Sequence, residues 1–280
     1  MTAELKMLCN RIEYLMSLYN ENKHDLLYEK TMSELGSLDY NALFMKINNL
    51  PLYRIRINEE ENDSVFVETK ELYYPPPKAV CNYGRVNKPR QSMFYCSEFS
   101  SICELELLYD YLDNYDIGNK KSATYSEWEI KQDLNLLVLA IAPTNREYSN
   151  GFAIRNKCFE FIKSDHKVAR HTYDNLYSLT SYFFLKNAKE DYSVYIVCSA
   201  IANFFTLKFP NIDGIIYPSV QGDTGYNIVL RPHVLDKKKI IPKAEVSMKE
   251  WIVSNENLMT INSSFLKMGQ INGSKIIWPN

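Results

Sequence analysis

"SMFYCSEFSSICELELLYDYL", residues 92–112, decides the fold class because it holds a strand followed at once by a helix. "SMFYCS" (92–97) is a short run with aromatic residues, which favours a strand. "SSICELELLYDYL" (100–112) places apolar side chains at helical spacing behind serines that can cap a helix. The segment therefore predicts a strand that leads directly into a helix.

The same segment, extended back to residue 84, carries Arg85, Tyr95 and Glu106 close together. It contains no histidine and no C-x-x-C pair, so its residues are poorly suited to proteolysis or metal chemistry. A planar cation, an aromatic ring and a carboxylate suit a flat substrate that carries both anionic groups and a positive charge.

Strands and helices mix along the rest of the chain without a regular βαβ rhythm. The prolines of "YYPPP" (73–77) predict an extended loop. We expect further strands at "LYRIRI" (52–57), "LNLLVLAIAP" (134–143), "IIYPS" (215–219) and "YNIVLRP" (226–232), and helices near 172–187 and 192–207. This pattern predicts an α+β fold rather than a parallel α/β sheet.

The first 50 residues are predicted to form an all-helical extension. Apolar side chains from Leu5 to Tyr19 form one helical stripe over residues 3–20. A second helix is expected over 24–36, before Gly36, and a third over 39–48, with Asp39 as its N-cap. The extension either packs against the core or offers a docking surface.

Composition and charge exclude several classes of protein. The chain has 280 residues, of which 46% are hydrophobic, so it can bury a sizeable core. Its net charge of −2 argues against binding to duplex nucleic acid. The longest apolar run, 134–143, is too short to span a membrane, and the N-terminus has no apolar leader segment. A cytoplasmic protein is expected.

Common enzyme motifs and metal sites are also missing. The six cysteines form no C-x-x-C pair and no cluster with zinc-ligand spacing, so no metal site is predicted. The sequence lacks a G-x-S-x-G elbow, a Walker loop, a G-x-G-x-x-G turn and an H-E-x-x-H helix. A nucleophile and base would need His166, His171 or His233, and nothing near these residues resembles a nucleophile motif.

Taken singly, the other candidate residues have ordinary explanations. Glu104 and Glu106 both flank the apolar stripe of the predicted helix, and helical spacing alone does not show which one faces a cleft. Arg54 and Arg56 are compatible with a sheet edge, and Ser219 with a turn.

In combination, four blocks make the chain resemble the RES-domain family, the NAD-consuming toxins of Xre–RES toxin–antitoxin pairs. "YRIR" (53–56) is similar to the family's opening strand, and "GRVN" (84–87) to its Gly-Arg-aromatic-Asn motif. "FYCSEFSSICELE" (94–106) resembles its strand-to-helix block, in which a tyrosine precedes a glutamate by 11 positions. "DGIIYPSVQGDTGYNIVLRP" (213–232) is similar to its Pro-Ser block with a following asparagine.

The resemblance implies roles for individual residues. Glu106, rather than Glu104, takes the position of the family's glutamate, since it follows Tyr95 by 11 residues. By the same match the catalytic residues would be Arg85, Glu106 and Ser219. The residues expected to bind substrate are Arg54, Arg56, Tyr95 and Asn227.

The resemblance also implies an ADP-ribosyltransferase-like fold and cleavage of NAD at the nicotinamide–ribose bond, with no cofactor. Inorganic phosphate is a candidate co-substrate, an Xre-type antitoxin a candidate partner, and a homo-oligomer a candidate assembly. The chain then divides into a helical extension (1–50), a RES-like domain (51–235, with a longer insertion around 112–212) and a C-terminal extension (236–280).

Two other functions stay open at this point. Val86 stands where the family usually has an aromatic residue, and with the long insertion it keeps open a catalytically weak regulator that binds a nucleotide or a protein. The implied fold also allows transfer of ADP-ribose to a macromolecule.

Overall fold

The computed structural model describes residues 3–19, 23–36, 42–58, 65–112, 118, 120–139, 178–188, 190–221, 225–255 and 260–279. Its helices are α1 (Ala3–Leu18), α2 (His24–Leu35), α3 (Ser100–Leu112), α6 (Ser193–Lys208) and α7 (Pro232–Asp236), with 3₁₀ turns η1 (Thr69–Leu72) and η2 (Pro77–Ala79). Residues 178–184 are also helical. The candidate histidines 166 and 171, with the whole of residues 140–177 and therefore the first part of the helix expected near 172–187, lie outside the described residues.

The strands join into one mixed sheet of ten strands, in the order β1-β5-β6-β7-β3-β2-β4-β8-β9-β10. Neighbouring strands pair antiparallel except β5 with β6, which are parallel. The strands are β1 (Leu43–Ile47), β2 (Leu52–Ile57), β3 (Phe94–Ser97), β4 (Lys120–Ile130), β5 (Leu134–Val138), β6 (Gly214–Pro218), β7 (Tyr226–Leu230), β8 (Ile240–Asn255), β9 (Thr260–Asn272) and β10 (Lys275–Ile277). The α+β class and the strand-to-helix junction of β3 and α3 are confirmed.

The N-terminal prediction is partly wrong. The helices expected over 3–20 and 24–36 are present as α1 and α2, but residues 43–47 form strand β1 instead of a third helix. Its exposure alternates, with Phe44 and Lys46 exposed and Met45 and Ile47 buried. β1 pairs antiparallel with β5. This strand pairing, rather than the local preference of a short apolar run, decides the conformation of residues 43–47.

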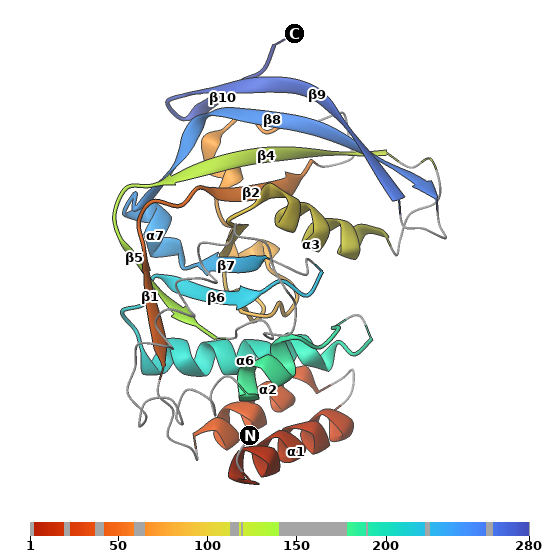
Figure 1. The fold of residues 1–280 in the computed structure, drawn as a ribbon, viewed down its shortest axis with the longest axis vertical. Coiled ribbons are helices and arrows are strands. Elements are labelled where there is room, and N and C mark those ends of the chain that lie inside the picture. Colours follow the sequence, from red (N-terminus) through yellow and green to blue (C-terminus); the bar gives the residue numbers. More distant parts are fainter. Residues whose placement is uncertain are drawn as a thin grey trace, which may run out of the picture.

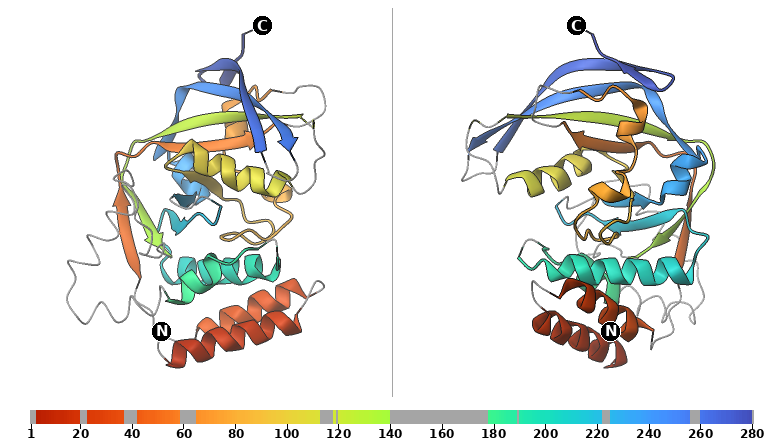
Figure 2. Two further views of the ribbon diagram at one scale, coloured as in Figure 1. Left: turned by 45° about the vertical axis from the view of Figure 1, so that its right-hand side comes forward. Right: turned by 180° about the vertical axis from the view of Figure 1, so that it is seen from behind.

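Helix α6 separates the N-terminal helices from the sheet, and α1 and β10 lie at opposite ends of the long axis (Figures 1 and 2). One core cluster joins α1 and α2 to α6 and to one face of β5, β6 and β7. A second lies on the other face, around Phe94 and Trp128, and a third lies beneath α3, around Tyr125 and Trp251. The amphipathic stripe of α1 is therefore used for packing.

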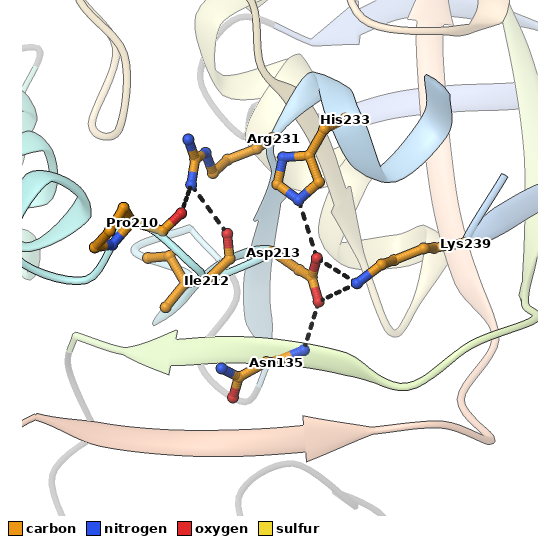
Figure 3. A network of polar contacts seen from close by, with 7 residues as sticks. All are labelled: Asn135, Pro210, Ile212, Asp213, Arg231, His233 and Lys239. Atoms are coloured by element: carbon orange, nitrogen blue, oxygen red, sulfur yellow. Dashed lines mark hydrogen bonds and ion pairs between the residues drawn. The ribbon is translucent and has the colours of Figure 1, made fainter. Parts of the chain in front are cut away.

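A buried polar network fixes the start of β6 (Figure 3). The Asp213 carboxylate accepts hydrogen bonds from Lys239 Nζ at 2.7 and 2.9 Å and from the Asn135 N–H at 2.9 Å, and lies 3.0 Å from His233 Nε2. Burial would raise the pKa of Asp213, but these contacts outweigh it and lower the pKa. The network ties β5, β6 and α7 together and holds the strand that leads to Ser219.

Candidate active site

A cavity of about 710 Å³ lies among β2, β3, α3, α6 and the loop of residues 80–91. Its charged lining residues are three arginines, Arg54, Arg56 and Arg85, and one glutamate, Glu106. The cavity is therefore locally positive although the whole chain carries a net charge of −2. A positive, partly apolar cavity of this size suits an anionic organic ligand.

Glu106 is the acidic group of the cavity and is held by two hydrogen bonds. Its Oε1 accepts from the Ser219 hydroxyl at 2.5 Å and from Nδ2 of Asn227 at 2.9 Å. Within the described chain, Oε2 accepts no hydrogen bond. One carboxylate oxygen is thus fixed by the protein, and the other remains available to a ligand.

Three separate elements bring these groups together. Glu106 lies in the second turn of α3, Ser219 follows β6, and Asn227 is the second residue of β7. Asn227 pairs with Tyr217 across the two strands, so their side chains share a face of the sheet. The Ser219 N–H donates to the carbonyl of Gly225 at 2.8 Å, which closes the connection between β6 and β7.

Arg85 is almost fully buried, with 7% of its surface exposed, and is fixed from the side of α6. Its Nη2 donates to the carbonyl of Lys186 at 2.8 Å, and its guanidinium lies 5.5 Å from the ring centroid of Tyr195. Nη1 lies 3.9 Å from Sγ of Cys198. In the described part of the chain Nε has no partner, so the guanidinium keeps donors for a ligand.

Tyr95 fixes the loop that carries Arg85. Its hydroxyl donates to Oδ1 of Asn87 at 2.7 Å and accepts from the Val86 N–H at 3.3 Å. Gly84 is required beside this contact, because a Cβ there would lie 2.5 Å from Oδ1 of Asn87 and 3.0 Å from the Tyr95 hydroxyl. Burial raises the pKa of Tyr95, so its hydroxyl stays protonated and can act as a donor.

The part of the chain that forms this cavity matches a known protein family. The sequence profile of the RES domain matches residues 51–249, which run from β2 into β8 and include every residue of the cavity site described above. The chain belongs to the RES domain family.

No curated protein sequence matches the chain. Among solved structures, the crystal structure of the M. tuberculosis MbcT–MbcA toxin–antitoxin complex contains a similar chain, with 11% identity and a TM-score of 0.36. The similarity covers 83% of this chain and 94% of the other.

The structure distinguishes the two glutamates that helical spacing left unresolved. Glu106 lines the cavity, whereas Oε1 of Glu104 accepts from the Tyr125 hydroxyl at 2.6 Å and from Lys249 Nζ at 3.0 Å. Glu104 therefore joins α3 to β4 and β8 on the other side of the helix.

Arg54 and Arg56 line the same cavity, but the backbone already occupies many of their donors. Arg54 donates hydrogen bonds to three backbone carbonyls: from Nε to that of Leu72 at 3.1 Å, from Nη1 to that of Tyr95 at 2.8 Å and from Nη2 to that of Tyr73 at 3.3 Å. Burial, with the neighbouring charge of Arg56, lowers the pKa of Arg54 to about 10. Arg56 is half-buried and donates to the Glu71 carbonyl.

Ser219 reaches the site through Glu106. Its side chain is not among the residues that line the cavity, and its hydroxyl is directed to the carboxylate. Asn227 lines the cavity but donates to the same oxygen. Both side chains are thus placed to orient Glu106.

The site also contains residues that the sequence did not single out. Tyr217 and Tyr195 line the cavity beside Arg85, and Asn87 fixes the loop through Tyr95. The alternation of side chains along β6 assigns Tyr217 to the cavity face of the sheet only once the pairing of β6 with β7 is known. Tyr195 lies on α6, outside every motif of the family resemblance, and carried no signal in the sequence.

Other features of the described residues concern metals, thiols and membranes. No three His, Cys, Asp or Glu side chains gather there with the geometry of a metal site. The five described cysteines form no disulfide bond with one another, and Cys158 lies outside the described residues. In the described ranges, no helix combines the length and the apolar character needed to cross a membrane.

Proposed function

We propose that this RES-domain protein cleaves NAD at the bond between nicotinamide and ribose. The observation that carries the proposal is the Glu106 carboxylate, which lines a positive cavity and is held at Oε1 by Ser219 and Asn227. Arg85 lines the same space. A carboxylate beside arginines matches a substrate that joins a cationic glycoside to a diphosphate.

Binding would use the charge and the rings of the cavity. The diphosphate of NAD is dianionic, and guanidinium groups bind such oxygens through charge-assisted, often bidentate hydrogen bonds. Arg85 is the best placed, because its Nη2 makes one backbone hydrogen bond whereas Arg54 donates to three backbone carbonyls. Tyr95 and Tyr217 would form apolar walls that exclude water from the ribose.

The chemistry requires only one carboxylate. Nicotinamide leaves its N-glycosidic cation as a neutral amide, so no general acid has to protonate it, unlike the leaving group of an ordinary glycoside. Glu106 would stabilise the oxocarbenium-like ribose through Oε2 or orient the incoming nucleophile. Ser219 and Asn227 act as positioning residues, because their hydrogen bonds fix the carboxylate before the substrate arrives.

The attacking group is either water or inorganic phosphate. Water gives ADP-ribose, and phosphate gives ADP-ribose 1″-phosphate. The positive cavity would accept phosphate as a co-substrate, and the two products distinguish the reactions.

The test is NAD turnover by the purified chain, with and without phosphate, alongside Glu106→Gln. Glu104→Gln is the matched control, since it changes the same residue type on the same helix, outside the cavity. We expect Glu106→Gln to lose about 10²–10³-fold in kcat, as for removal of one electrostatic stabiliser of a transition state. Glu104→Gln should retain turnover.

Other outcomes would select other functions. Nicotinamide release with label incorporated into protein or nucleic acid would indicate an ADP-ribosyltransferase. NAD binding without loss of NAD at high enzyme concentration would contradict the enzyme and favour a regulatory nucleotide-binding protein. Equal activity of Glu106→Gln and the parent would remove Glu106 from the mechanism.

We further infer, from membership of the RES domain family, that NAD loss makes the protein growth-inhibitory and that an Xre-type antitoxin neutralises it. Expression of the parent chain should arrest growth, and expression of Glu106→Gln should not. Co-expression with a neighbouring Xre-type protein should restore growth. Cytoplasmic location and a homo-oligomer are part of the same proposal, and fractionation and sedimentation would test them.

A further inference from the structure

A second hollow, of about 810 Å³, adjoins the reaction cavity. The two spaces share Asn82, Tyr83 and Tyr192 as lining residues. The far side of the second hollow is formed by Lys23, His24 and neighbouring residues at the start of α2. Since the family profile begins at residue 51, these α2 residues lie outside it.

A row of side chains connects the reaction cavity to this hollow. Arg85 lies 5.5 Å from the ring centroid of Tyr195, whose ring lies 5.8 Å from that of Tyr192. Tyr192 in turn lies 5.2 Å from His24, and His24 lies 6.4 Å from Tyr83. The row leads from the arginine of the reaction cavity to a group of three rings.

The two tyrosines of this group are held by their own hydroxyls. The Tyr83 hydroxyl donates to Oδ1 of Asp25 at 2.6 Å, and the Tyr192 hydroxyl accepts from the Tyr83 N–H at 3.0 Å. Both rings are therefore fixed before a ligand binds, which lowers the entropic cost of binding. Tyr192 keeps 37% of its surface exposed, so part of the ring remains available for stacking.

We propose that the second hollow binds the adenosine half of the dinucleotide, with the purine stacked on Tyr192 and His24. This inference rests on the proposed function and extends the binding site to α2. Purine rings stack favourably on aromatic side chains, because every base has a flat π face. Asn82, on the shared wall, offers the paired donor and acceptor that match an adenine edge.

The proposal assigns a function to the N-terminal helices. Asp25 and His24 at the start of α2 complete the hollow, while α1, α2 and α6 share one hydrophobic core. The helical extension would then be part of the substrate-binding site as well as a packing element.

The test compares NAD with nicotinamide mononucleotide, which has the scissile bond but lacks the adenosine half. Tyr192→Leu removes the ring, Tyr192→Phe keeps it and removes the hydroxyl, and Tyr14→Leu removes an exposed ring on α1 that lines neither space. Tyr192→Leu should lower kcat/KM for both substrates by different factors. We expect the fold-loss for NAD to be about ten times the fold-loss for the mononucleotide. Tyr192→Phe should show a much smaller selective loss, and Tyr14→Leu none.

Titration with AMP gives a readout that does not depend on turnover. The parent and Tyr14→Leu should bind AMP, and Tyr192→Leu should bind it about tenfold more weakly, as measured by calorimetry. Equal AMP binding by all variants would overturn the proposal, as would an equal loss on both substrates or an equal effect of Phe and Leu at position 192. If the parent does not turn over NAD, the proposed function fails and the AMP titration alone decides the inference.

Discussion

Replacing Tyr95 with phenylalanine tests how the arginine loop is held. The Tyr95 hydroxyl bridges that loop by donating to Asn87 at 2.7 Å and accepting from the Val86 N–H at 3.3 Å. Tyr95→Phe removes both hydrogen bonds and leaves a side-chain acceptor and a backbone donor unsatisfied in a buried setting. Val86 and Asn87 are both buried, so water cannot readily replace the hydroxyl.

The expected cost follows from these two contacts. An unsatisfied buried polar group costs about 1–3 kcal/mol, and the longer of the two bonds belongs at the lower end of that range. We therefore expect the free energy of unfolding to fall by about 2–3 kcal/mol. For a chain of this size the melting temperature should fall by roughly 4–10 °C.

Tyr217→Phe is the matched control. Tyr217 is also a buried tyrosine of the cavity, but within the described chain its hydroxyl forms no hydrogen bond. Its free energy of unfolding should change by less than about 1 kcal/mol. Urea denaturation followed by tryptophan fluorescence measures both variants. The reasoning is refuted if Tyr95→Phe unfolds at the same urea concentration as the parent, or if both variants are destabilised equally.

Three further predictions concern the residues around the site. Asp213→Asn should lower the free energy of unfolding by roughly 3–5 kcal/mol at pH 7. Because folding lowers the pKa of Asp213, its contribution is present above the unfolded pKa and is lost as pH falls through the folded pKa, so denaturation near pH 3 should show a smaller difference. Glu104→Gln should reduce stability by about 1–3 kcal/mol while NAD turnover persists, and loss of turnover as complete as that of Glu106→Gln would contradict the assignment. Gly225→Ala would place a Cβ 2.3 Å from Cγ1 of Ile102 and should cost about 1–3 kcal/mol. Adding Ile102→Ala should cost less than the sum of the single changes, and strict additivity would show that the two residues do not clash.

Local pattern in the sequence determined several elements correctly. The apolar spacing of α3, the buried run of β5 and the stripe of α1 each follow from periodicity within one segment. The resemblance to the RES family, through the 11-residue gap that follows Tyr95, also favoured Glu106 over Glu104, and Glu106 lines the cavity. These features depend on residues that are close in sequence, so the chain alone specifies them.

Strand β1 shows where local pattern was insufficient. Residues 39–48 are compatible with a helix or a strand, because a short apolar run does not distinguish the two periods. Pairing with β5 decides for a strand, and β5 lies more than eighty residues further along the chain. The C-terminal segment likewise enters the fold by pairing β8 with β4.

The site itself depends on tertiary structure. Glu106, Ser219 and Asn227 meet because α3 packs beside the connection between β6 and β7, and helical spacing carries no information about that contact. Arg54 belongs to a recognisable strand motif, yet three backbone carbonyls from two distant segments take up its donors. A sequence specifies which side chains are present, whereas the donors and acceptors left over for a ligand depend on what the folded backbone has already bound.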